Sequence, residues 1–202
     1  MTCENCDPKQ YYPGKIILIE NNRSSIPFCR FCKDEIETDP LLKGGIRMSS
    51  NNGWDEYFHA IAMVVSGNSK CMSRKVGAVL TRNNAIISTG YNGPPRGIPK
   101  CRGSICPRQV VGFKSGEGLH LCPATHAEAN SIAQAAMNGV STSGASMYLT
   151  CGVPCKNCLA LIINAGIAEV VCTSEEYYDN LSEYILENSD LIVRVYEHLE
   201  EA

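Results

Sequence analysis

Segments with the periodicity of strands and helices alternate along most of this 202-residue chain, and this alternation restricts the fold more than any other feature. The series begins with an amphipathic helix that starts at Trp54 and ends before Gly67, and a hairpin follows it. Such an order predicts a mostly parallel sheet with helices on both faces. The predicted helices cover residues 54–65, 126–137, 155–165 and 175–187, and the predicted strands cover residues 76–81, 85–89, 147–150, 168–173 and 191–196.

The part of the chain before this main domain divides into a small unit, residues 1–37, and a linker with Pro and Gly breakers, residues 38–53. The main domain is residues 54–202. A unit of fewer than about 40 residues needs a metal or another cross-link for stability, so we expect a zinc-ribbon-like unit with a structural zinc. Its predicted ligands are Cys3, Cys6, Cys29 and Cys32. Residues 1–50 carry seven basic and seven acidic side chains, and this balance favours a structural clip over a nucleic-acid-binding unit.

The cysteine content points to metal binding. There are 12 cysteines, and no apolar segment typical of a secretory signal begins the chain. The longest apolar runs last about six residues, far short of a bilayer span, so no membrane partner is expected. These features predict a cytoplasmic protein, or one of the host cytoplasm if a phage encodes it. In a reducing compartment, Cys-x-x-Cys pairs indicate metal ligands rather than disulfides.

Residues 92–125 interrupt the alternation with five prolines, six glycines and three cysteines. A loop of that length needs a function or a cross-link. Three thiolates require a fourth ligand to complete a tetrahedral zinc site. We therefore predict a second zinc that staples this loop through Cys101, Cys106 and Cys122, with Cys71 or His120 as the fourth ligand.

The sharpest signal is His126-Ala127-Glu128 followed by Pro154-Cys155-Lys156-Asn157-Cys158. One His and two Cys ligands leave an open position on zinc, as in catalytic sites, and zinc lowers the pKa of a water there. Glu128 is placed to move protons between that water and a substrate. This pair of motifs is the signature of zinc nucleobase deaminases. The alternative is that His126 only caps a helix and that Cys155 and Cys158 bind one more structural zinc.

Together with other motifs, this pair resembles the deoxycytidylate (dCMP) deaminase family over about residues 54–180. The motifs are Lys70-Cys71, 74–79, 86–93, 126–132, 154–158 and 163–167. The resemblance implies a three-layer αβα sandwich of the cytidine-deaminase-like type with a five-stranded mixed sheet. It implies zinc at His126, Cys155 and Cys158, with Glu128 as the proton shuttle. The implied reaction converts dCMP to dUMP and ammonia, which supplies dUMP for thymidylate synthesis.

The resemblance also implies regulation and assembly. Many members are homohexamers that dCTP with Mg²⁺ activates and dTTP inhibits. The implied effector loop is Gly90, Tyr91, Asn92 and Gly93. The implied substrate contacts are Asn92, Ala127 and Tyr178, although the neighbouring Tyr177 leaves the register of the last open. In bacterial and phage relatives, cysteines that match Cys71 and Cys101 bind a second zinc; here Cys106 and Cys122 complete the set, with His120 as the alternative.

Charge is distributed unevenly along the chain. Residues 57–116 contain nine basic side chains and no acidic one, whereas residues 128–202 contain eleven acidic and two basic side chains. Ser73, Arg74 and Lys75 precede a strand that should border the pocket, so we expect them to bind the substrate's 5′-phosphate. The alternative is an exposed, solvated basic face.

A second hypothesis keeps the deaminase chemistry and changes the substrate to a base in RNA or single-stranded DNA. Such a substrate needs an open channel with basic and aromatic side chains. The long loop, the acidic C-terminal third and the presence of one Trp argue against it, and against a nucleic-acid partner generally.

Overall fold

The computed structural model describes residues 45–48, 53–101, 106–114 and 117–196. Contacts divide the chain into two units, Met1–Lys43 and Gly44–Ala202, and all the described residues belong to the second. The predicted zinc-ribbon-like unit, with Cys3, Cys6, Cys29 and Cys32, therefore lies outside the described residues.

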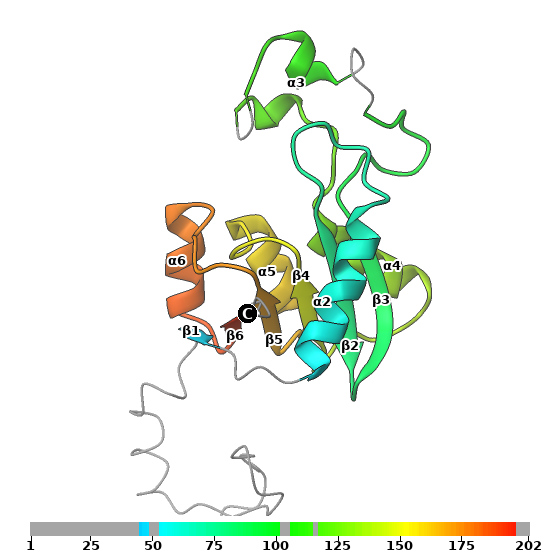
Figure 1. Ribbon diagram of the computed structural model, residues 1–202. Coiled ribbons are helices and arrows are strands. Elements are labelled where there is room, and N and C mark those ends of the chain that lie inside the picture. Colours follow the sequence, from blue (N-terminus) through cyan, green and yellow to red (C-terminus); the bar gives the residue numbers. More distant parts are fainter. Residues whose placement is uncertain (1–44, 49–52, 102–105, 115–116, 197–202) are drawn as a thin grey trace, which may run out of the picture. The chain divides into compact units, whose positions relative to one another are not determined.

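A mixed sheet in the order β1-β6-β5-β4-β2-β3 forms the centre of the second unit (Figure 1). β1, β6, β5 and β4 are parallel neighbours, whereas β2 runs antiparallel to both β4 and β3. The five strands expected from the sequence are present in this mixed sheet. The bounds are β1 Gly45–Met48, β2 Gly77–Arg82, β3 Ala85–Tyr91, β4 Ser146–Leu149, β5 Glu169–Cys172 and β6 Ile192–Val195.

The sixth strand, β1, corrects the prediction that residues 38–53 are only a linker. Gly45 to Met48 pair in register with Ile192 to Val195 of β6. The glycine- and proline-containing sequence around β1 gives no strand periodicity. The edge of β6 nevertheless presents unpaired backbone groups that an extended segment can bind.

Helices cover both faces of the sheet. α2 (Gly53–Ser66) packs on one face, where Phe58 and Ala62 meet Val79, Tyr148 and Val171 of the strands. Gly77 of β2 makes this approach possible, because a Cβ there would lie 2.0 Å from the Ala62 carbonyl oxygen. The predicted first helix is thus confirmed.

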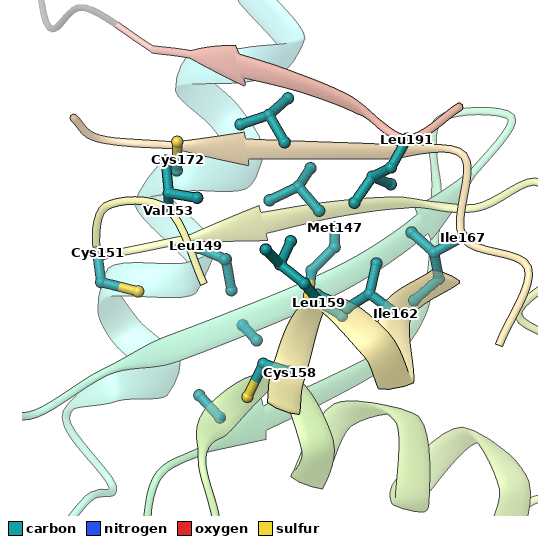
Figure 2. Packing of buried hydrophobic residues seen from close by; sticks show 14 of the residues in the cluster. Met147, Leu149, Cys151, Val153, Cys158, Leu159, Ile162, Ile167, Cys172 and Leu191 are labelled. Carbon is teal, nitrogen blue, oxygen red and sulfur yellow. The ribbon is translucent and has the colours of Figure 1, made fainter. Parts of the chain in front are cut away.

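The other face carries α4 (Ala127–Met137), α5 (Lys156–Asn164) and α6 (Asn180–Glu187). Its larger core includes Leu159 and Ile162 of α5, packed against Met147 and Leu149 of β4 (Figure 2). Alternating strand residues thus point to the two cores, which gives the three-layer sandwich that the family resemblance implied.

A network of charged and polar side chains lies beside the smaller core. Asp55 of α2 is fully buried, and the Arg194 guanidinium contacts its carboxylate at 2.7 Å and that of Glu169 at 2.6 Å. The Tyr148 hydroxyl donates a further hydrogen bond to Asp55 (3.1 Å). These bonds satisfy charges whose burial would otherwise be costly, and they join α2 to β4 and β6.

Two local predictions differ from the structure. The 92–125 loop contains two short helices, α3 (Pro107–Val110) and η2 (Leu119–Leu121), where no regular structure was expected. α6 begins at Asn180 rather than at Glu175, because Asp179 caps it by accepting a hydrogen bond from the Ser182 backbone N–H. In the described part of the chain, none of the helices combines the length and the apolar character of a membrane span.

Candidate active site

The site lies where β3 and β4 end. β2 is antiparallel to both strands, so the carboxyl ends of β3 and β4 and the start of β2 share one edge of the sheet. The segments that follow β3 and β4 lead into α4 and α5. Ligand sites in open α/β sheets form at such an edge, because loops and helix N-termini converge there.

Several contacts fix the start of α4 against β3. The backbone of Gly93 exchanges hydrogen bonds with Thr125, at 3.1 and 2.9 Å, and the Asn130 side chain donates to the Tyr91 carbonyl (2.8 Å). A Cβ on Gly90 would lie 2.4 Å from the Ala127 carbonyl oxygen, so only glycine permits this approach. His126, at the N-cap of α4, is held by this packing.

The start of α5 is fixed in a similar way. Thr150, directly after β4, exchanges hydrogen bonds with Gly77 through its backbone N–H and its hydroxyl oxygen. Asp179 accepts a hydrogen bond from the Lys156 backbone N–H (3.1 Å). Cys155 is the N-cap of α5, and Cys158 lies one turn later.

These two helix starts bring three metal-ligand atoms together. The Nδ1 atom of His126 lies 3.5 Å from the Cys155 sulfur and 3.4 Å from the Cys158 sulfur. Tetrahedral zinc bonds to nitrogen and sulfur place such atoms about 3.6 Å apart. All three ligand atoms lie within 4.8 Å of one another, and this is the one such group of His, Cys, Asp or Glu among the described residues. The donor set and its spacing fit zinc.

One of the two thiols at this site lies in surroundings that favour its thiolate form. The pKa of Cys155 is lowered to about 4, first by its hydrogen bond with Cys158 and also by its hydrogen bond with His126. The hydrogen bond with Cys155 in turn raises the pKa of His126. The thiolate is the form that binds metal, so the surroundings of Cys155 favour its ligand state, whereas the same hydrogen bond raises the pKa of Cys158.

Glu128 lies beside the three ligands in the first turn of α4. The residue is 4% exposed, and burial raises the pKa of its carboxyl group. Its pKa shift also includes contributions from His126, Cys155 and Cys158, so it shares their immediate surroundings. A carboxyl group with a raised pKa both accepts and releases a proton near neutral pH.

A cavity of about 390 Å³ opens onto this group. Its wall includes His126, Glu128 and Cys155, together with the predicted substrate residues Ser73, Arg74, Asn92, Ala127 and Tyr178. Lys75, also predicted to bind phosphate, is exposed and does not belong to the described wall.

Asn92 supports the basic segment through the backbone. Its amide oxygen accepts from the Val76 N–H (2.9 Å) and its amide nitrogen donates to the Arg74 carbonyl (2.8 Å). The side chain therefore fixes the segment before β2 that carries Ser73 and Arg74.

Tyr177 and Tyr178 both line the cavity, so the structure leaves a substrate role open to either. The ring of Tyr178 lies edge-on to that of His126, with centroids 6.3 Å apart. Tyr178 is thus the one whose ring contacts a metal-site residue.

The four cysteines predicted to bind the loop zinc are arranged more loosely than His126, Cys155 and Cys158. Burial raises the pKa of Cys101, and the thiols of Cys106, Cys71 and Cys122 raise it further, so the four predicted ligands are electrostatic neighbours. No three of these sulfurs meet the spacing that His126, Cys155 and Cys158 show in the described region. The alternative ligand, His120, is exposed and packs edge-on to Phe113.

Comparison with known families gives the family of the chain. Residues 52–174 match the family described as the cytidine and deoxycytidylate deaminase zinc-binding region. The matched span includes His126, Glu128, Cys155 and Cys158. The chain belongs to this family.

Named relatives and solved structures agree with this deaminase family. The deoxycytidylate deaminase of Mycobacterium phage D29 is 39% identical over 131 residues, which are 62% of this chain and 98% of the phage protein. Those of Saccharomyces cerevisiae and Schizosaccharomyces pombe are each 36% identical, over 73% and 89% of this chain. The chain spans 46% and 53% of these two yeast proteins, about half of their length.

The dCMP deaminase of the cyanophage S-TIM5, solved in complex with dCMP and dUMP, matches 73% of this chain and 100% of its own. The TM-score is 0.59 and the sequence identity is 25%.

Sequence reasoning missed two residues of this deaminase-family cavity, Arg108 and Glu176, which line it. The absence of acidic residues from 57–116 indicated that the basic side chains of this segment, Arg108 among them, meet an anion. The burial of Arg108, however, depends on how the long loop folds. No local pattern indicated Glu176.

Proposed function

We propose that this chain catalyses the zinc-dependent hydrolytic deamination of dCMP to dUMP and ammonia. One observation carries the proposal: the buried Glu128 lies in a cavity beside His126, Cys155 and Cys158. The names of the relatives and the dCMP and dUMP complex of the cyanophage enzyme support dCMP as the substrate.

His126, Cys155 and Cys158 would hold zinc, which supplies Lewis-acid activation of water when bound. Glu128 takes the proton of the attacking water and gives it to N3 of cytosine. The same carboxylate then takes the remaining proton from the C4 hydroxyl and gives it to the C4 amine, so that the C4–N bond breaks, the C4 carbonyl forms and ammonia leaves. Burial of Glu128 serves both steps, because a raised pKa brings proton uptake and release closer in energy.

Substrate binding is proposed along the cavity wall. Ser73 and Arg74 bind the 5′-phosphate, with Lys75 adding charge from the exposed side, while Asn92, Ala127 and Tyr178 contact the nucleoside. Asn92 also holds the segment around Arg74 in place.

Two structural zinc ions are proposed in addition to the catalytic one. The first is bound by Cys71, Cys101, Cys106 and Cys122, and the second by the N-terminal cysteines. The electrostatic proximity of the loop thiols supports the first. Metal analysis of the purified chain is expected to give three zinc ions, and two in Cys106→Ser. A count of one in the native chain would contradict both structural sites.

Regulation and assembly are proposed from the family alone. The enzyme would be a homohexamer in the cytoplasm, activated by dCTP with Mg²⁺ through residues 90–93 and inhibited by dTTP. Its product would supply dUMP for thymidylate synthesis.

The deciding experiment follows the loss of cytosine absorbance with dCMP, deoxycytidine, CMP and dCTP in parallel, each with and without dCTP and Mg²⁺. We expect fast turnover of dCMP, increased by dCTP. Absence of turnover in a zinc-loaded enzyme would overturn dCMP as the substrate. Release of ammonia from tRNA or single-stranded DNA would then support the polynucleotide hypothesis.

A further inference from the structure

Arg108 combines burial with a lack of charged partners. The residue lies in α3 and is 6% exposed. Its Nε donates to the Glu117 carbonyl (2.6 Å), and one terminal nitrogen donates to the Lys114 carbonyl (2.7 Å). Among the described residues the ion pairs are those of Arg194, so Arg108 has no carboxylate partner there.

A buried guanidinium in this state still has hydrogen-bonding capacity. It carries five N–H donors, and the two carbonyl bonds occupy two of them. Burial of a cation is costly unless a counter-charge compensates it. Arg108 lines the same cavity as Glu128, so an anion in that cavity can supply the missing charge.

A second cation lies in the same wall. Arg74 and Arg108 both line the cavity, and Tyr178 lies in the same wall. A ligand that extends past Tyr178 can meet both.

The orientation of Arg108 is set before a ligand arrives. The two carbonyls that hold it belong to residues 114 and 117, beyond the end of α3 on the same loop. A guanidinium fixed in this way loses little side-chain entropy on binding, and its planar donors suit the paired oxygens of a phosphate. The long loop thus delivers a preorganised cation to the cavity.

We propose that Arg108 is a specificity-determining residue that binds the 5′-phosphate of the substrate together with Arg74. This inference rests on the proposed function. It assigns to the 92–125 loop the preference for a nucleotide over the corresponding nucleoside.

A purely structural Arg108, which only holds the loop through its two carbonyl bonds, makes a different prediction. Loss of loop structure would impair every substrate alike, whereas loss of a phosphate contact impairs only substrates that carry a phosphate. The ratio of kcat/KM for dCMP to that for deoxycytidine separates the two roles.

The test compares Arg108→Gln and Arg108→Lys with the control Arg96→Gln in the zinc-loaded full chain. Arg96 lies in the same loop and donates to Gln134 and Met137 on α4. For Arg108→Gln we expect kcat/KM for dCMP to fall about 100-fold, mainly through KM, while the value for deoxycytidine stays within about threefold. In Arg108→Lys, kcat/KM for dCMP should be about tenfold higher than in Arg108→Gln, because the positive charge remains. Arg96→Gln should preserve the ratio.

An equal loss for dCMP and deoxycytidine in both Arg108 variants would overturn the proposal. If Arg108→Gln fails to fold by circular dichroism, Arg108→Lys decides by the same ratio. Binding is measured separately by titration with dUMP and deoxyuridine, which requires no turnover. Native enzyme that binds dUMP but does not deaminate dCMP would refute the proposed function alone. Unchanged dUMP affinity in the Arg108 variants would refute the role of Arg108 alone.

Discussion

The carboxylate of Asp179 accepts a hydrogen bond from the backbone N–H of Lys156, the residue that follows Cys155. Its other oxygen accepts from the Ser182 N–H and caps α6. One side chain thus contacts the starts of two helices, the first of which begins at the proposed zinc ligand Cys155 and carries Cys158. We infer that Asp179 positions these proposed ligands, although it does not belong to the described cavity wall.

Asp179→Ala should lower the free energy of unfolding by about 1 kcal/mol, the usual cost of losing an N-cap. It should also weaken zinc affinity, because the first turn of α5 loses a fixed point. Thermal unfolding and competition with a zinc chelator measure the two effects. Asp190→Ala, at an exposed position after α6, is the control. Unchanged zinc affinity in Asp179→Ala would show that the bond to Lys156 does not position the ligands.

The contribution of Asp179 should persist in mildly acid solution. Burial acts to raise its pKa, but the hydrogen bonds from Lys156 and Ser182 outweigh burial and lower the pKa. A carboxyl group with a lowered pKa stabilises the fold above its unfolded pKa and loses this effect as the pH falls through the folded value. The stability difference between native chain and Asp179→Ala should therefore be constant from pH 8 to about 5 and shrink below about 4. A difference that disappears already at about pH 6 would contradict this assignment.

Glu128→Gln should retain zinc and lose turnover. The amide keeps the size of the side chain but does not accept the proton of water, so kcat should fall by about 10³-fold or more. Metal analysis and dCMP turnover test this together. Activity within about tenfold of the native enzyme would exclude the proton-transfer role.

Cys158→Ser and Cys172→Ser form a matched pair of buried thiol substitutions. Figure 2 shows both residues in the larger core, where Cys158 lies in α5 and Cys172 at the end of β5. The Cys158 sulfur lies 3.4 Å from His126 Nδ1, whereas the Cys172 thiol donates to the carbonyls of Ser174 and Arg194. Zinc content should fall by one ion in Cys158→Ser and stay unchanged in Cys172→Ser. Equal zinc contents would place the catalytic metal elsewhere.

Gly90→Ala should destabilise the chain through the contact of β3 with α4. A Cβ at Gly90 would lie 2.4 Å from the Ala127 carbonyl oxygen and from the Ser131 nitrogen, so the backbone of α4 must shift. We expect a loss of about 1–3 kcal/mol in the free energy of unfolding. Gly93→Ala, three residues further along the chain, is the control, since its Cβ would meet only ring atoms of Tyr91 at 3.8 Å or more. Chemical denaturation of both variants provides the comparison, and equal stabilities would contradict the close approach.

Much of the fold could be predicted from local sequence, because it depends on local periodicity. α2 and the hairpin formed by β2 and β3 followed the expected spacing of apolar residues, and the turn at Asn83 and Asn84 has the positive φ angles that asparagine tolerates. β1 and the start of α6 could not be predicted in this way. β1 depends on pairing with β6, whose paired residues lie 147 positions later in the chain, and the start of α6 depends on the cap at Asp179.

The residues of the candidate site also divide into those that the sequence predicted and those that only the structure revealed. Motif spacing alone singled out His126, Cys155, Cys158 and Glu128, because ligands and proton donor lie within one turn of two helix starts. Only the tertiary structure revealed that Arg108 is buried in the cavity wall. Its environment depends on the carbonyls of a loop without periodicity and on a cavity built from distant segments. Sequence therefore determined which chemistry the chain carries, while long-range packing decided which side chains surround it.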